Sequence, residues 1–242
     1  MNYIMDLHTH TLASGHAYST LTENLRTAKE KGLEIVGLTD HAPTMPGSFH
    51  DFYFSNLRVI PDYIEGIRVL KGVELNVLNA EGDVDLDERT LSFLDYAIVS
   101  LHPPCIEPGT MAQNTDALIA AMRHKIVKII GHPDDSRYPL DYERLVLAAK
   151  ANRVLLEVNN SSLSLDSFRE NAEENYITLL TLCKKHEAMI VVNSDCHFHN
   201  AIGGFENAAP LLKKLDFPKH LIANFQLKDE VMAWRSSFDQ NK

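Results

Sequence analysis

Short runs of β-branched and apolar residues alternate with longer amphipathic stretches along this 242-residue chain. The runs have the length and composition of buried strands, and the stretches between them repeat apolar residues at helical spacing. The expected strands are Tyr3–Leu7, Glu34–Leu38, Val69–Val73, Ala97–Leu101, Val127–Ile130, Val154–Val158 and Met189–Asn193, with a short extra strand at His220–Ala223. The expected helices are Leu21–Lys31, Ile60–Glu65, Asn114–His124, Tyr142–Ala151, Ala172–His186 and Glu206–Leu215.

The repeated strand–helix order predicts an α/β fold of parallel strands joined by crossover helices. Either an open doubly wound sheet or a β/α barrel fits this order. A nucleotide-binding open sheet needs a glycine-rich turn after its first strand, whereas here the first strand runs into His8-Thr9-His10. The length also favours the barrel, for which about 250 residues is typical. No repeat or linker divides the sequence, so we expect one domain over residues 1–242.

Composition narrows the class of protein further. The chain has 23 basic and 33 acidic residues, a formal charge of −10, and no apolar run near the length of about 18 residues that spans a membrane. The acidic balance disfavours a nucleic-acid partner. The opening residues MNYIMDLHTH do not form a secretory signal, and three scattered cysteines make no disulfide framework. We therefore expect a cytoplasmic globular protein.

The twelve histidines are the unusual feature of the composition. Several of them, with two acids, stand where the predicted strands end, and in a β/α barrel those ends converge on the face that carries the active site. Eight candidate metal ligands come from strand ends: His8, His10, His41, Glu74, His102, His132, Asp195 and His197. His16, in the first loop, is a ninth candidate. The remaining histidines are expected to have ordinary structural roles.

Local spacing supports a shared metal site. His8 and His10 are two residues apart, as are Asp195 and His197, so each pair points to one side of an extended segment. Imidazole and carboxylate groups suit Zn²⁺, Mn²⁺ or Fe²⁺, and no cysteine pair indicates a closed structural zinc site. Nine ligands are too many for one tetrahedral ion, so we expect two or three ions with Glu74 as a bridge.

Six short motifs, in this order, resemble those of the PHP superfamily (polymerase and histidinol phosphatase). They are Asp6-Leu7-His8-Thr9-His10, Thr39-Asp40-His41, Gly72-Val73-Glu74, His102-Pro103, Gly131-His132-Pro133 and Ser194-Asp195-Cys196-His197. Each motif alone is short, but six in order make a specific pattern. The resemblance covers residues 6 to about 197. It implies a distorted (β/α)7 TIM-like barrel and a stand-alone phosphatase with three metal ions.

The resemblance also implies which residues hold the three divalent ions, with Zn²⁺ as the first choice and Mn²⁺ or Fe²⁺ as alternatives. It places the ligands in three sets: His8, His10, Glu74 and Asp195; Glu74, His102 and His132; and His16, His41 and His197. Asp6 and Asp40 are expected to support the ligands rather than bind metal. A homotrimer is expected if the chain assembles as its relatives do.

These expectations describe a metal-dependent phosphatase that hydrolyses phosphomonoesters with a metal-activated hydroxide as nucleophile. Glu74 and Asp195 are the predicted catalytic carboxylates, and Arg137 and Asn159 are the predicted contacts to a small phosphorylated substrate. Three divalent ions would make a cationic well in an acidic protein. The loop Ala42–Val59, which contains several aromatic residues, either covers the site or packs on the barrel rim.

Three other functions share the predicted site. A PHP-type phosphodiesterase or nuclease would use the same metals, although no basic stripe with interleaved aromatic residues is present. A non-catalytic metal-binding scaffold is the second alternative, but metal stores tend to use thiolates. An amide hydrolase is the third, and the absence of a lysine at the predicted strand ends disfavours it.

Overall fold

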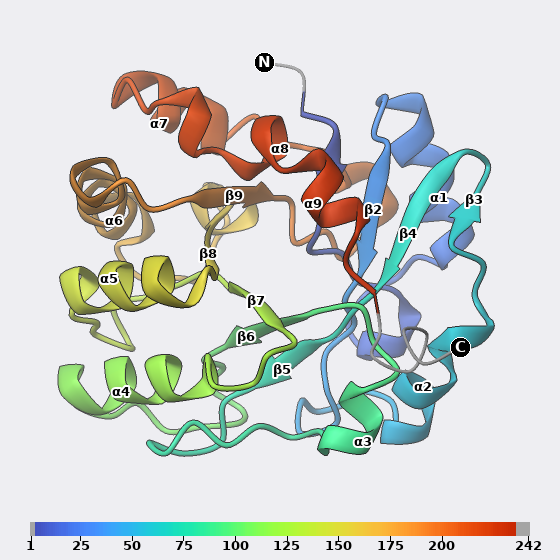
Figure 1. Cartoon of the computed structure of the whole chain (residues 1–242), viewed down its shortest axis with the longest axis horizontal. Coiled ribbons are helices and arrows are strands. Elements are labelled where there is room, and N and C mark those ends of the chain that lie inside the picture. The colour runs from blue at the N-terminus through green and yellow to red at the C-terminus, as the bar shows by residue number, and fades with distance from the viewer. Residues whose placement is uncertain (1–2, 236–242) are drawn as a thin grey trace.

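The computed structural model describes residues 3–235 and contains two sheets (Figure 1). The first has the strand order β1-β2-β4-β3 and the second β5-β6-β7-β8-β9. Every neighbouring pair is parallel except β3 and β4. The strands are β1 (Met5–Asp6), β2 (Ile35–Leu38), β3 (Tyr63–Ile64), β4 (Ile67–Lys71), β5 (Glu74–Asn76), β6 (Ala97–Ser100), β7 (Val127–Ile130), β8 (Leu155–Asn159) and β9 (Ile190–Asn193).

The two sheets meet along both edges at the carboxyl ends of their strands. Isolated parallel bridges join Thr9 to Cys196 on one side and His41 to Glu74 on the other. The parallel strands therefore follow one another around a ring, which is the arrangement of a distorted barrel. Within residues 3–235 no continuous hydrogen-bonded ladder closes that ring. The predicted α/β class with parallel strands is confirmed.

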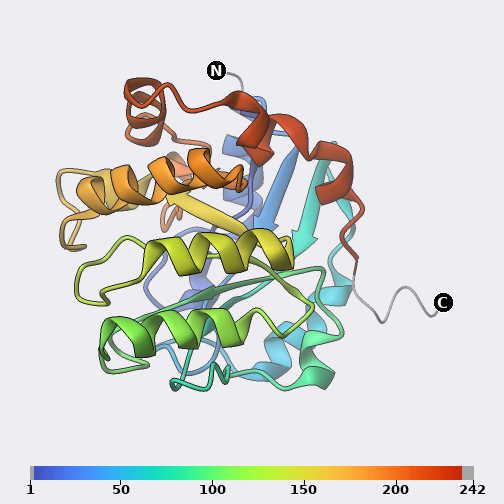
Figure 2. The same ribbon diagram turned by 60° about the vertical axis from the view of Figure 1, so that its left-hand side comes forward.

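Helices surround the strands on the outside (Figures 1 and 2). Figure 2 shows α4, α5 and α6 side by side against the five-stranded sheet. The helices are α1 (Leu21–Glu30), α2 (Asp51–Asn56), α3 (Glu88–Leu91), α4 (Met111–Ala121), α5 (Tyr142–Asn152), α6 (Ala172–His186), α7 (Ala208–Lys214), α8 (Ala223–Gln226) and α9 (Lys228–Met232). None of the helices in the described part of the chain is long and apolar enough to cross a membrane.

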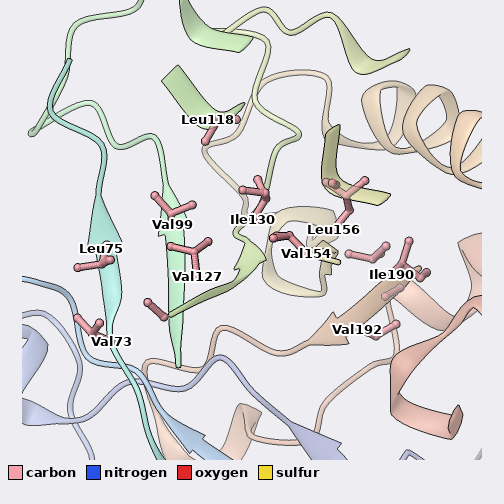
Figure 3. Close-up of a cluster of buried hydrophobic side chains, with 14 of the residues drawn as sticks. Val73, Leu75, Val99, Leu118, Val127, Ile130, Val154, Leu156, Ile190 and Val192 are labelled. Atoms are coloured by element: carbon pink, nitrogen blue, oxygen red, sulfur yellow. The ribbon is translucent and has the colours of Figure 1, made fainter. Parts of the chain in front are cut away.

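The core has two layers because side chains alternate along each strand. Ile98 belongs to the inner cluster within the ring, and its neighbour Val99 belongs to the outer cluster between strands and helices. Leu155 and Leu156 divide in the same way. Figure 3 shows part of the outer cluster, with labelled side chains from β5 to β9 and Leu118 of α4.

The amino end of the ring is covered by the last helices. Ile222 forms a bridge to Ile190, the first residue of β9, and α8 and α9 add Ala223 and Val231 to the inner cluster. Apolar side chains therefore fill the middle and the amino end of the ring. The carboxyl end is left for polar residues.

Some predicted elements are wrong, and the turns explain why. Residues 60–65 are not a helix: β3 forms a hairpin with β4 across Glu65 and Gly66, whose φ angles are 51° and 90°. Two successive positive φ angles are typical of a tight two-residue hairpin turn. The predicted strand at 220–223 is a 3₁₀ turn with one bridge. The helix predicted to begin at Asn114 begins at Met111, because Thr110 and Gln113 form a capping box.

Candidate metal centre

All eight strand-end candidates lie together at the carboxyl end of the ring. Most are fully or nearly buried, as catalytic and ligand groups in a closed pocket are. Their positions follow the strand order: His8 and His10 after β1, His41 after β2, His102 after β6, His132 after β7, and Asp195 and His197 after β9. Glu74 differs from the prediction, because it is the first residue of β5, three residues after β4 ends, and reaches the cluster through its bridge to His41. The fold therefore collects residues that are as far apart in sequence as His8 and His197.

Glu74 is the hub of the cluster, because five imidazoles surround its carboxylate. The distances from Oε2 are 3.3 Å to His8 Nε2, 3.5 Å to His10 Nε2 and 2.7 Å to His41 Nδ1. The distances from Oε1 are 3.2 Å to His102 Nε2 and 2.9 Å to His132 Nε2. Each oxygen thus faces a different set of imidazoles, which is the arrangement that a bridging carboxylate requires.

Asp195 approaches two of the same imidazoles from the other edge of the five-stranded sheet, after β9. Its Oδ1 lies 3.0 Å from His10 Nε2 and 3.6 Å from His8 Nε2. Its Oδ2 accepts a hydrogen bond of 3.0 Å from Asn159 Nδ2. Asp195 and His132 both have positive φ angles, 54° and 26°, which non-glycine residues rarely adopt. Strain of this kind is typical of functional sites.

His16 lies at the outer edge of the cluster. Its ring centroid is 4.9 Å from those of both His41 and His197, and the residue is exposed. Among the described residues, four sets of three donor atoms lie within 4.8 Å of one another, and His16 is in none of them. These sets are His10, His41 and His197; His8, His132 and Asp195; His8, His10 and Glu74; and His41, Glu74 and His102.

The donor atoms fit a cation. Five buried atoms of the cluster have no hydrogen-bonding partner within residues 3–235: His8 Nε2, His10 Nε2, His41 Nδ1, Glu74 Oε2 and Asp195 Oδ1. Buried polar atoms are nearly always hydrogen-bonded, so several that converge without partners indicate a place for positive ions. Imidazole nitrogen and carboxylate oxygen are the donors that zinc, manganese and iron accept.

Other side chains orient the imidazoles. Three rings donate a hydrogen bond from Nδ1 to a neighbour outside the cluster, so that the Nε2 lone pair faces inward. The bonds are His8 to Glu157 Oε1 at 2.8 Å, His10 to Ser14 Oγ at 2.9 Å and His102 to Asn76 Oδ1 at 2.7 Å. With the hydrogen on Nδ1, Nε2 of each ring is free to bind a metal.

The electrostatics keep both carboxylates ionised. Burial alone would raise the pKa of Glu74, but His8, His41 and His102 lower it well below its usual range. Burial would also raise the pKa of Asp195, but His8, His10 and His197 lower it well below its usual range. Both groups are therefore in the charged form that binds metal.

The histidines divide into two kinds. Burial lowers the pKa of His102 to about 3 and holds the pKa of His10 well below its usual value, so both rings are neutral. His8 is the exception: burial would lower its pKa, but Glu157 and Glu74 raise it well above the usual value. A cation would replace the proton on that ring.

The two predicted substrate contacts occupy different places. Arg137 lines a cavity of about 720 Å³ that opens onto the cluster, and its guanidinium is paired with Asp135, with Nε 3.0 and 2.9 Å from the two carboxylate oxygens. Asn159 is fully buried and binds Asp195 and Glu157. Asn159 therefore holds two carboxylates of the site in place and does not line the cavity.

The loop at 42–59 both packs on the rim and borders the site. Met45 and Pro46 line the cavity, whereas Phe54 is buried in the outer core. Tyr53 donates a hydrogen bond of 2.7 Å to Asp40 Oδ2, and Asp40 in turn accepts from Ser14, the partner of His10. Asp40 therefore supports the site rather than joining it, as expected.

Sequence reasoning missed two charged residues at the site, Glu157 and Arg169. Glu157 lies on β8 two residues after Leu155, so its side chain also points into the ring. A glutamate within an otherwise apolar strand is rarely an ordinary core residue, and this was the signal that the sequence offered. Arg169 lies in the loop after β8, where no sequence signal distinguishes it.

Known proteins are similar to this chain over most of its length. A family model described as the PHP domain matches residues 6–220. A protein of Clostridium acetobutylicum named "Probable phosphatase" is 44% identical over 231 residues, covering 96% of this chain and 94% of that protein. A "Probable phosphatase" of Photobacterium profundum is 44% identical over 218 residues, covering 90% of this chain and 88% of its own.

Solved structures share the fold at low identity. The histidinol phosphate phosphatase of Lactococcus lactis, complexed with zinc, L-histidinol and phosphate, superposes with a TM-score of 0.58 at 17% identity, over 89% of this chain and 95% of that one. A chain of an archaeal ribonuclease P with mature tRNA gives a TM-score of 0.59 at 15% identity, over 98% and 93% of the two chains.

Proposed function

Because the chain belongs to the PHP domain family, we propose that its strand-end cluster binds three divalent metal ions and hydrolyses phosphomonoesters. The enzyme is a phosphatase, the class named for relatives that are 44% identical over nearly its whole length. The observation that carries the proposal is the carboxylate of Glu74, which faces imidazoles through both oxygens within one buried cluster.

The nine proposed ligands are His8, His10, His16, His41, Glu74, His102, His132, Asp195 and His197. Zinc is the proposed ion, since the donor set suits it, and zinc is bound in the Lactococcus lactis phosphatase. Divalent ions held there supply Lewis-acid activation of a water molecule and neutralise charge on the phosphoryl group.

The chain's own residues set the geometry for that chemistry. The two carboxylate oxygens of Glu74 face different groups of imidazoles, and Glu157 fixes the orientation of the His8 ring. Of the two predicted catalytic carboxylates, Asp195 is the one that lines the cavity, and Asn159 donates a hydrogen bond to its Oδ2. With a lowered pKa, Asp195 is a weak base, so it contributes to catalysis by holding charge and orientation more than by accepting a proton.

The cavity fits a small phosphorylated molecule. About 720 Å³ lies within the range of small-molecule sites, and its lining includes the apolar residues Met45, Pro46, Pro103 and Phe168. The cytoplasm is the proposed location, in keeping with the free thiols of the chain. A homotrimer remains a prediction.

The test is hydrolysis of p-nitrophenyl phosphate by the full chain after metal loading and after chelation. Turnover that appears with zinc or manganese and disappears with chelator supports the proposal. Faster turnover of single-stranded DNA or of bis(p-nitrophenyl) phosphate at the same metal content would favour the phosphodiesterase alternative. No turnover of any ester would favour a non-catalytic metal-binding protein.

A further inference from the structure

Arg169 has an unusual environment for an arginine. Its side chain is only 9% exposed, and the described residues 3–235 accept no hydrogen bond from its guanidinium. The nearest charged atom is Asp195 Oδ2, 3.9 Å from Nη2, which is beyond hydrogen-bonding distance. A guanidinium has five N–H donors, and burying it without hydrogen bonds is costly. Among residues 3–235 these donors have no hydrogen-bonding partner, so they are available to a ligand in the cavity.

The guanidinium also borders the cavity beside the metal cluster. Arg169 lines the same cavity as His132, Asp195 and His197. Burial would lower its pKa, but Asp134 and Asp195 raise it, so the group is always a cation. A permanent cation with free donors, next to a phosphatase centre, suits an oxyanion.

Arg137 provides a contrast within the same cavity. Both guanidiniums lie near the ring of Phe168, with Cζ 5.4 Å from the ring centroid for Arg137 and 5.5 Å for Arg169. Arg137, however, is already held by the carboxylate of Asp135. Of these two arginines, Arg169 is the one whose donors remain available.

We propose that Arg169 binds a terminal oxygen of the substrate's phosphoryl group and thereby makes the site prefer phosphomonoesters to phosphodiesters. This inference rests on the proposed phosphatase function and assigns its specificity to one residue. A monoester carries three terminal oxygens and two negative charges near neutral pH. A diester carries two terminal oxygens and one charge, and its second ester group would have to occupy the place of the third oxygen.

The surroundings of Arg169 explain why that difference matters. The guanidinium is almost buried, so a group that contacts it must be small and anionic. A terminal oxygen meets both conditions, and an ester-linked carbon group meets neither. The second negative charge of the monoester also strengthens its hydrogen bonds to the guanidinium.

The experiment uses the full metal-loaded chain and three variants: Arg169→Met, Arg169→Lys, and Arg144→Met as the matched control, since Arg144 is an exposed arginine of α5 that pairs with Asp116. Binding of inorganic phosphate is measured by calorimetry, at metal contents shown to be equal by plasma mass spectrometry. Turnover is measured on p-nitrophenyl phosphate and on bis(p-nitrophenyl) phosphate. Arg169→Met is expected to weaken phosphate binding about 10- to 100-fold, the range for charge-assisted hydrogen bonds.

The same variant is expected to lower the ratio of monoester to diester kcat/KM about tenfold or more. Arg169→Lys keeps the charge and should recover part of both effects, and Arg144→Met should change phosphate affinity less than about fivefold. Unchanged phosphate affinity in Arg169→Met, or an equal fall in turnover of both esters, would overturn the assignment.

Failure of the proposed function gives a different result. If the metal-loaded wild type hydrolyses neither ester, the phosphatase proposal is refuted, and the difference in phosphate binding between wild type and Arg169→Met still decides whether Arg169 is an anion site. A wild type that binds no phosphate overturns the anion site as well. If Arg169→Met does not fold, Arg169→Lys supplies the comparison.

Discussion

Replacement of Glu157 by glutamine tests how the chain controls the tautomer of its first histidine. The carboxylate of Glu157 is fully buried and accepts four hydrogen bonds from four donors. Oε1 accepts from His8 Nδ1 at 2.8 Å and Asn193 Nδ2 at 2.7 Å, and Oε2 accepts from the amide nitrogen of His132 at 2.7 Å and Asn159 Nδ2 at 3.2 Å. Glutamine has the same shape but presents one oxygen and one NH₂ group.

Neither orientation of the new amide satisfies these donors. With the NH₂ group toward His132 and Asn159, two buried donors lose their acceptor, at about 1–3 kcal/mol each. With the NH₂ group toward His8, the ring must accept at Nδ1 and carry its hydrogen on Nε2, the atom that faces Glu74. A protonated Nε2 cannot bind metal. Glu157→Gln is therefore expected to lose about 2–6 kcal/mol of stability without metal.

Zinc affinity should fall about 10- to 100-fold, the usual effect of removing a group that orients a ligand. The assays are urea unfolding of the metal-free protein and zinc titration against a competing chelator. Glu143→Gln is the matched control, because Glu143 is exposed and pairs with Lys185 and His186 on the surface. Wild-type zinc affinity in Glu157→Gln would refute the argument from tautomers.

Three other substitutions test separate parts of the account. Glu74→Gln should abolish zinc binding at the bridge and phosphatase activity together, with an unchanged far-ultraviolet circular dichroism spectrum; full activity would exclude Glu74 as the bridge. Asp134 is buried and burial raises its pKa from 3.8 to about 6, so the wild type loses stability as pH rises from about 4 to 6. Asp134→Asn lacks this titration and should gain up to about 3 kcal/mol relative to wild type between pH 4 and 7 in urea unfolding; a difference that does not change with pH would contradict the shift. Thr20→Ala removes the capping box of α1 and should lower the free energy of unfolding by about 1 kcal/mol, measured as a fall in Tm. Thr181→Ala, on the exposed side of α6, is the control and should leave Tm unchanged.

The parallel fold could be predicted because its signals are local. Strand 127–130 and helix 172–186 have the predicted bounds, since each is a clear apolar run or an amphipathic repeat. The hairpin of β3 and β4 was missed because its strand Tyr63–Ile64 has only two residues, too few to show a period. The wrong helix prediction there came from the helical spacing of the apolar residues in that segment.

The gathering of the candidate ligands could be predicted because strand ends converge in this fold, whatever the loops do. The residues that surround the ligands could not be predicted. Asn76 and Ser14 act through hydrogen bonds whose partners are distant in sequence, and Arg169 reaches the cavity from an irregular loop. Asn159 and Arg137 were both predicted to contact the substrate, but the side-chain pairing that decides what each contacts is not visible in the sequence.

The central claim is that this cluster holds three metal ions, and metal content tests it most directly. The full chain, purified without tag or chelator, is analysed by plasma mass spectrometry before and after incubation with zinc. The account predicts close to three transition-metal ions per chain, and fewer in Glu74→Gln. One ion or none, with no increase after zinc is added, would contradict the three-metal site and the chemistry derived from it.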